Sequence, residues 1–144
     1  MIKVYTSTII NASADAVWAT VRDFNALPKW ASFVADSHIE SGLPSDKVGC
    51  VRHLQLQDGG IIREKLLTLS DYDFQCTYSI LESPMDVDNY VATLKLTPVT
   101  DGNTTFVEWW AEFDTPPGKE RELTDAIGQG VFQTAFNQLK LMFR

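Results

Sequence analysis

The sequence has few of the residues that metal or redox chemistry needs. It contains only two cysteines, Cys50 and Cys76, and two histidines, His38 and His53. No CxxC or HExxH spacing brings them together, so neither a zinc site nor a redox motif is predicted. Both cysteines lie in apolar, strand-like segments, and we expect two reduced, buried thiols and no metal or other cofactor.

Long hydrophobic runs and clusters of basic residues are also missing. The apolar runs are far shorter than the roughly 20 residues that cross a bilayer, so neither a membrane span nor a secretion signal is predicted. The net charge is −7, which disfavours binding to nucleic acid or to anionic lipid surfaces. Together with reduced cysteines, these features favour a cytoplasmic protein.

The common motifs of nucleophilic and nucleotide-dependent enzymes are absent. The sequence has no GxSxG, P-loop or dinucleotide fingerprint, which weighs against hydrolases and against nucleotide- or NAD-dependent enzymes. The composition is that of an ordinary globular protein, with 44% hydrophobic and 22% charged residues among 144. Without a linker or an internal repeat, this length predicts a single domain over residues 1–144.

Hydrophobic periodicity predicts an α+β fold. Residues 2–11 alternate and predict a strand, Ser13 caps a helix over 14–23, and Pro28 interrupts the pattern before a second short helix or turn over 27–34. A period of two and short turns then predict an antiparallel meander. Its strands are expected near 35–42, 48–57, 61–70, 73–82, 88–99 and 104–114.

The C-terminal segment predicts one long helix over residues 119–143. Its apolar face comprises Gly128, Phe132, Ala135, Leu139 and Met142, and only the inner face of the sheet is large enough to cover it. Gly128 and Gly130 are unfavourable in a helix and are expected to permit a bend or a close approach to the sheet. We therefore expect a seven-stranded curved antiparallel sheet wrapped around this helix.

Short motifs in this order resemble the bacterial polyketide cyclase/dehydrase-like, or MxaD-like, branch of the START/Bet v 1-like (SRPBCC) superfamily. They extend over nearly the whole chain: Ser13-Ala-Asp-Ala-Val-Trp18, Val21-Arg-Asp-Phe24, Leu27-Pro-Lys-Trp30, Gly49-Cys-Val-Arg52-His53, Ile62-Arg-Glu64-Lys-Leu66, Tyr78-Ser-Ile80, Pro84, Asn89-Tyr90, Val107-Glu-Trp109 and Phe113. The resemblance implies a helix-grip fold with an internal cavity, in a family that binds lipids, hormones or polyketides or catalyses cyclisation.

Strand alternation selects the residues that face this cavity. The expected inward positions include Cys50, Arg52, Leu54, Leu56, Ile62, Glu64, Leu66, Thr68, Cys76, Tyr78, Ile80, Tyr90 and Trp109. A three-residue loop at 58–60 would pair Leu56 with Ile62 and Leu54 with Glu64, and would leave Arg52 diagonal to Glu64. His53 then points away, whereas a two-residue loop would turn it toward the side of Glu64.

The candidate site is an Arg52–Glu64 pair with the hydroxyls of Tyr78 and Tyr90 inside an apolar shell. Leu54, Trp109 and Phe132 are expected in its walls, and Trp30 and Phe33 either form a lid at its mouth or pack in the core. The polar groups either satisfy one another structurally or orient a ligand. If a reaction occurs, Glu64 is the candidate base and a tyrosine the candidate donor.

Three functions remain compatible with these residues. The first is binding of a small hydrophobic or amphipathic molecule, which needs no catalytic group. The second is a cofactor-independent cyclase, dehydratase or isomerase that uses Glu64 and the tyrosine hydroxyls. The third is an interaction protein with a collapsed cavity, for which Trp110 on the outer face offers a possible homodimer contact.

Overall fold

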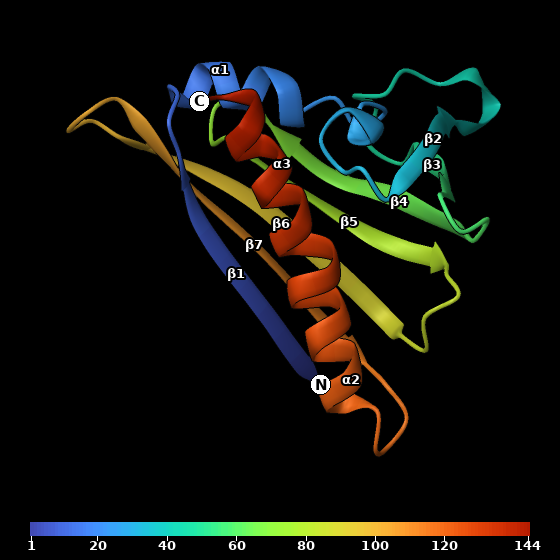
Figure 1. Ribbon diagram of the computed structural model, residues 1–144. Coiled ribbons are helices and arrows are strands. Elements are labelled where there is room, and N and C mark those ends of the chain that lie inside the picture. The colour runs from blue at the N-terminus through green and yellow to red at the C-terminus, as the bar shows by residue number, and fades with distance from the viewer.

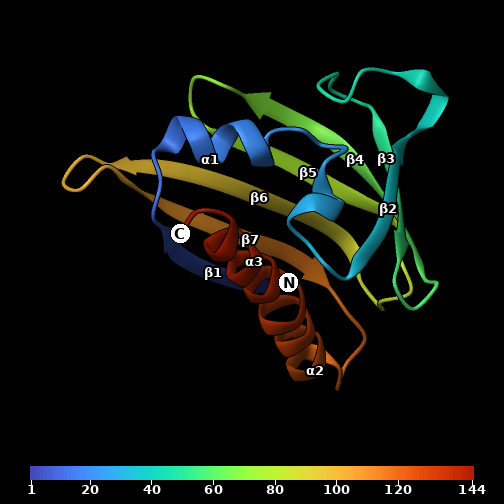
Figure 2. The ribbon, with the colours of Figure 1, turned by 45° about the horizontal axis from the view of Figure 1, so that its top comes forward.

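The computed structural model describes residues 1–144 and contains one sheet of seven antiparallel strands. Figures 1 and 2 show the C-terminal helix lying across the inner face of this curved sheet, with a short helix, α1, on the same side. The strands are β1 (Ile2–Ile10), β2 (Val34–Ile39), β3 (Val51–Leu56), β4 (Ile61–Ser70), β5 (Gln75–Glu82), β6 (Asp88–Val99) and β7 (Thr104–Asp114).

The order of strands in the sheet is β1-β7-β6-β5-β4-β3-β2. Strands β2 to β7 therefore form the predicted meander of neighbouring hairpins, and β1 closes the other side by pairing with β7 from Ile2–Phe113 to Ile10–Thr105. The helix-grip fold expected from the sequence is confirmed. None of its helices combines the length and the apolar character needed to cross a membrane.

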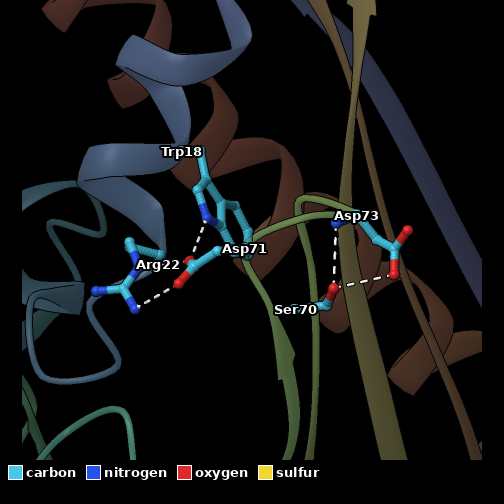
Figure 3. Close-up of polar contacts among 5 residues, drawn as sticks. All are labelled: Trp18, Arg22, Ser70, Asp71 and Asp73. Carbon is cyan, nitrogen blue, oxygen red and sulfur yellow. Dashed lines mark hydrogen bonds and ion pairs between the residues drawn. The ribbon is translucent and has the colours of Figure 1, made fainter.

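Helix α1 (Ala14–Val21) begins where the sequence predicts and ends two residues earlier. The Ser13 hydroxyl accepts a hydrogen bond from the Ala16 amide, as an N-cap does. At its other end α1 is tied to the β4–β5 turn, because Trp18 Nε1 and Arg22 Nε both donate to Asp71 Oδ1 at 2.7 Å (Figure 3). The next helix, η1 (Leu27–Lys29), is a single 3₁₀ turn with Pro28 near its start.

The C-terminal helix is continuous but changes its winding in the middle. It consists of α2 (Glu120–Asp125), a π-helical segment η3 (Ala126–Gln133) and α3 (Thr134–Met142). A π-turn is wider than an α-turn, and the five-residue step between the buried Ile127 and Phe132 fits it. Met142, which a uniform α-helical pattern places on the inner face, is 42% exposed.

Gly128 lies where the helix packs closely against Val4 of β1. A Cβ atom at this position would be 3.2 Å from Val4 Cγ1, whereas one at Gly130 would meet nothing within 4 Å. The expected close approach to the sheet is therefore present at Gly128 and absent at Gly130.

The β3–β4 hairpin has a different register from the predicted one. Arg52 lies directly opposite Glu64, and Leu54 opposite Ile62. The cause is the loop, which spans residues 57–59 and is closed by a hydrogen bond from the Leu56 amide to the Gly60 carbonyl. The shift is two residues, so each side chain keeps the predicted face.

Strand β4 contains an irregularity that reverses the predicted orientation of Thr68. Leu66 pairs with Tyr78 but Thr68 pairs with Thr77, so Leu67 is an extra residue on β4. Beyond this β-bulge the faces exchange. Thr68 is exposed and hydrogen-bonds to Thr77 at 2.6 Å, while Leu69 packs against the core.

Three strands of the meander are shorter than predicted, and β1 ends one residue early. The prediction for 35–42 extends past β2 into a 3₁₀ turn, η2 (Glu40–Gly42), where Ser41 has φ of 61°. The strand predicted over 48–57 is observed only as β3. The strand predicted over 73–82 begins two residues later, as β5, because Phe74, with φ of 53°, still belongs to the turn. Residues with a left-handed φ depart from the extended backbone of a strand, and Ser41 and Phe74 both lie outside the strand ladders.

Candidate functional site

The inner face of the sheet carries one buried ion pair. Arg52 on β3 and Glu64 on β4 are 5% and 6% exposed. Arg52 Nε donates to Glu64 Oε1 at 2.8 Å, and Nη2 lies 2.7 Å from the same oxygen. Nη1 donates to the Phe24 carbonyl at 3.0 Å, so the guanidinium is anchored to the segment after α1 as well as to β4.

Two aromatic rings pack against this guanidinium. Its central carbon lies 3.9 Å from the centre of the Phe24 ring and 4.9 Å from that of Tyr78. Cation–π contacts of this kind stabilise a desolvated arginine. The sequence prediction missed Phe24, because the residue follows α1 in a segment without the period of a helix or a strand.

Two buried tyrosines lie beside the ion pair. Trp109 Nε1 on β7 donates to the Tyr78 hydroxyl on β5 at 3.1 Å, and Tyr90 on β6 stacks on Phe113. Burial raises the pKa of Tyr78 and of Tyr90 well above the ordinary value, so both hydroxyls stay neutral and can donate hydrogen bonds.

Burial also raises the pKa of Glu64, since removal from water disfavours the carboxylate, and the charge and hydrogen bond of Arg52 oppose this rise. The pKa of Glu64 therefore lies above that of an exposed glutamate. A perturbed pKa of this kind occurs both in structural ion pairs and at functional sites. Glu64 is the only acidic residue among the side chains that line the interior cavities.

Trp109 is the centre of an aromatic cluster. Its ring centre lies 4.3 Å from that of Phe132 on η3 and 5.3 Å from that of Trp30, which follows η1. Trp30 is only 2% exposed, and its Nε1 has no hydrogen-bond partner. A buried donor without a partner costs about 1–3 kcal/mol.

Two small cavities remain between these side chains. The larger has a volume of about 40 Å³ and the smaller about 10 Å³. Five predicted residues from five strands line the larger one, namely Arg52, Glu64, Tyr78, Tyr90 and Trp109, together with the predicted Phe33 and Leu54 and with Leu27, Leu56, Ile62 and Val131.

Trp30 lines the smaller cavity, whereas Phe132 packs on Trp109 without lining either cavity. Arg52, Tyr78 and Trp109 are common to both linings, so these three side chains form the partition between the two spaces. A single water needs roughly 10–15 Å³. The closed interior therefore holds water-sized voids and no space for a lipid or a polyketide.

A larger hollow of about 380 Å³ lies elsewhere, around the β5–β6 connection. Its lining includes Glu82, Asp86, Asp88 and Pro116 and none of the predicted site residues. It is a wide, shallow groove, and we do not assign the site to it because the buried polar groups gather in the interior.

His53 lies on the opposite face of the sheet from Arg52. Its ring stacks on that of His38 with 4.7 Å between centres, and its Nδ1 is 3.7 Å from Glu40 Oε2. It lines neither interior cavity. On the same outer face, Trp110 stacks on Tyr5 and lies 5.7 Å from the Lys3 ammonium, which partly cover it.

The cysteines and the acidic residues form no metal centre. Cys50 and Cys76 are free and buried, and burial raises the pKa of Cys76 to about 11. No group of three or more His, Cys, Asp or Glu side chains is arranged to hold a metal ion.

Comparisons with known proteins agree with this geometry. The family model described as "Polyketide cyclase / dehydrase and lipid transport" matches residues 1–143. The structure of the protein XoxI from Bacillus cereus is 31% identical over 99% of this chain and 96% of its own, with a TM-score of 0.89. A protein from Thermobifida fusca is 28% identical over 99% and 93% of the two chains, with a TM-score of 0.90.

A START superfamily protein from Mycobacterium smegmatis shares the fold, with a TM-score of 0.79 at 14% identity over 98% of this chain and 96% of that one. No curated protein matches the chain significantly. From the family match over residues 1–143, the chain belongs to the polyketide cyclase/dehydrase and lipid transport family, and its fold is that of the START superfamily protein.

Proposed function

We propose that this protein binds a small hydrophobic or amphipathic molecule in the space between the sheet and the C-terminal helix. The observation that carries the proposal is the shared wall of the two cavities. Arg52, Tyr78 and Trp109 line both spaces, so displacement of these side chains would merge the voids into one chamber with apolar walls and a few polar groups. Ligand sites have this composition, and the family description includes lipid transport.

Binding requires a conformation that is more open than the closed one. A ligand stabilises the open form only by as much as it binds that form better than the closed one. The mobile side of the larger cavity is expected to be Phe33 and Val131, because both are partly buried and lie on the segment after η1 and on η3, outside the sheet. The ladders hold the backbone of the strands in place, so the partition opens only by rotation of the side chains of Arg52, Tyr78 and Trp109.

Titration with the neutral fluorescent probe N-phenyl-1-naphthylamine tests this function. We expect saturable binding that Val131→Phe weakens, because the larger side chain fills the cavity of about 40 Å³ that Val131 lines. Val91→Phe is the matched control, since Val91 is 41% exposed on the outer face of β6. Equal probe binding by both variants would mean that the probe binds the outer surface and would contradict the proposal.

Native mass spectrometry of gently purified protein supplies an independent measurement. A retained small molecule supports binding and gives its mass. If no molecule is retained and no neutral probe binds, the small volumes of the cavities favour a second candidate function, an interaction protein whose interior stays closed.

The raised pKa of Glu64 favours a third candidate, a cofactor-independent cyclase, dehydratase or isomerase. Glu64 would accept a proton and Tyr78 or Tyr90 would donate to a carbonyl or enolate oxygen. Incubation of a retained ligand with the protein, followed by analysis of its structure, tests this function. Conversion of the ligand by the native protein would support a catalytic function if Tyr90→Phe slows the conversion and Val91→Phe leaves its rate unchanged.

A further inference from the structure

Trp30 Nε1 is the one buried polar side-chain atom without a hydrogen-bond partner. The other two buried indoles have acceptors: Trp18 donates to Asp71 at 2.7 Å, and Trp109 donates to Tyr78 at 3.1 Å. Nearly all buried donors in folded proteins are satisfied. The exception at Trp30 therefore needs an explanation.

The indole of Trp30 lies in the wall of the smaller cavity, next to the partition. Trp30 lines the smaller cavity beside the three side chains of the partition, Arg52, Tyr78 and Trp109. Any molecule that displaces the partition comes into contact with this indole, which is also held against Trp109 at 5.3 Å between ring centres.

A buried water satisfies this donor poorly. A stable water needs two to four polar partners, and eight of the ten residues that line this water-sized cavity of about 10 Å³ are hydrophobic. The closed form thus leaves a neutral donor unused at the edge of an apolar space.

The charges around the interior are already balanced. Arg52 is paired with Glu64, and Arg22, the other cation that lines the smaller cavity, binds Asp71 through two nitrogens. A ligand carboxylate would therefore be buried without a free counter-charge, which is costly. A neutral acceptor needs only a neutral donor.

We infer that the ligand is an uncharged, mainly hydrophobic molecule with an acceptor oxygen, such as a ketone or an ester carbonyl, and that Trp30 Nε1 donates a hydrogen bond to this oxygen. The inference rests on the binding function proposed above and adds the charge and the polar group of the ligand. In this arrangement Trp30 selects among hydrophobic molecules of similar shape.

Three probes of nearly the same shape test the inference by calorimetry at neutral pH. They are 2-acetylnaphthalene, 2-isopropenylnaphthalene, in which a methylene group replaces the carbonyl oxygen, and 2-naphthoate, in which a carboxylate replaces the acetyl group. A hydrogen bond of ordinary strength predicts that the ketone binds roughly two- to tenfold more tightly than the alkene. We expect the carboxylate to bind most weakly of the three.

Trp30→Phe removes the donor but keeps an aromatic ring. We expect this variant to bind the ketone and the alkene equally, because it has no N–H to donate to the ketone oxygen and the alkene accepts no hydrogen bond. In the native protein, the ¹H–¹⁵N signal of the Trp30 indole should shift downfield with the ketone and not with the alkene. This measurement needs the variant only to assign the signal.

The possible outcomes separate the inference from the proposed function. If none of the three probes binds, the proposed binding function is wrong. If the ketone and the alkene bind equally to the native protein with no shift of the Trp30 indole signal, or if the carboxylate binds most tightly, the site binds ligands but the role of Trp30 is wrong.

Discussion

Arg52 and Glu64 face each other across β3 and β4, and two nitrogens of the guanidinium contact one carboxylate oxygen. Nε and Nη2 lie 2.8 and 2.7 Å from Oε1, and neither contact involves Oε2. Glu64 also lines the larger cavity. One carboxylate oxygen thus holds the arginine, and the same residue contributes to the polar surface of the interior.

Glu64→Gln is expected to destabilise the fold. The side chains of the pair are 6% and 8% exposed, so the substitution leaves the Arg52 charge buried with a weakened partner. Loss of one partner from a desolvated pair costs about 3–5 kcal/mol. Urea denaturation should show this decrease in the free energy of unfolding.

The double variant Arg52→Met/Glu64→Leu is the control for this prediction. It removes both charges, and apolar replacement of a buried pair is often neutral or stabilising. We expect it to be more stable than Glu64→Gln alone. A Glu64→Gln protein as stable as the native one would show that the pair contributes no net stability and that Glu64 is free to serve a ligand.

Tyr78→Phe should cost more stability than Tyr90→Phe. The Tyr78 hydroxyl accepts the hydrogen bond of Trp109 Nε1, so its removal leaves a buried indole without an acceptor, at a cost of about 1–3 kcal/mol. Tyr90→Phe leaves that bond intact. Thermal melts of the two variants compare them directly, and equal losses would indicate that Tyr90 holds a structural bond of similar strength.

Alternation along the strands explains why the residues of the interior could be predicted from the sequence. The predicted β3–β4 register was wrong by two residues, yet Arg52 and Glu64 still share a face because side chains alternate with a period of two. An error of one residue would have placed Arg52 and Glu64 on opposite faces and His53 on the face of Glu64.

Local irregularities could not be predicted from the same pattern. The extra residue at Leu67 turns Thr68 outward, and no glycine or proline in that strand signals the bulge. The contact of Phe24 with Arg52 depends on the path of the chain after α1. Segment η3 winds as a π-helix and packs against β1, whereas the periodicity of the sequence predicted one uniform helix.

Gly128 and Gly130 should respond differently to substitution with alanine. Alanine is better than glycine in a helix by about 0.8–1.0 kcal/mol, and a Cβ at residue 130 meets nothing within 4 Å. Gly130→Ala should therefore stabilise the protein. Gly128→Ala should gain less or lose stability, because its Cβ would lie 3.2 Å from Cγ1 of the buried Val4.

The additional substitution Val4→Ala tests the cause of this difference. Removing the valine methyl groups should make the Gly128→Ala exchange more favourable than it is in the native background, as measured by chemical denaturation. An identical effect of Gly128→Ala in both backgrounds would exclude the contact with Val4 as the reason for the glycine.

The contact of α1 with the β4–β5 turn predicts a pH-dependent signal from Trp18. Hydrogen bonds from Arg22 and from Trp18 lower the pKa of Asp71 below its ordinary value of 3.8. Because the folded-state pKa is the lower one, the stabilising contribution of Asp71 is complete above pH values near 3.8 and is lost as the pH falls through the folded-state pKa. Asp71 is largely exposed, so the effect on stability should be small.

The Trp18 indole ¹H–¹⁵N signal reports this titration directly, because Nε1 donates to Asp71 Oδ1 at 2.7 Å (Figure 3). We expect a transition with a midpoint below pH 3.8 that Asp71→Asn abolishes. Asp73→Asn is the control, since Asp73 bonds to Ser70 in the same turn and not to α1. A midpoint at or above 3.8, or a transition that persists in Asp71→Asn, would show that Asp71 does not hold α1 against the hairpin, and that a group elsewhere causes the signal.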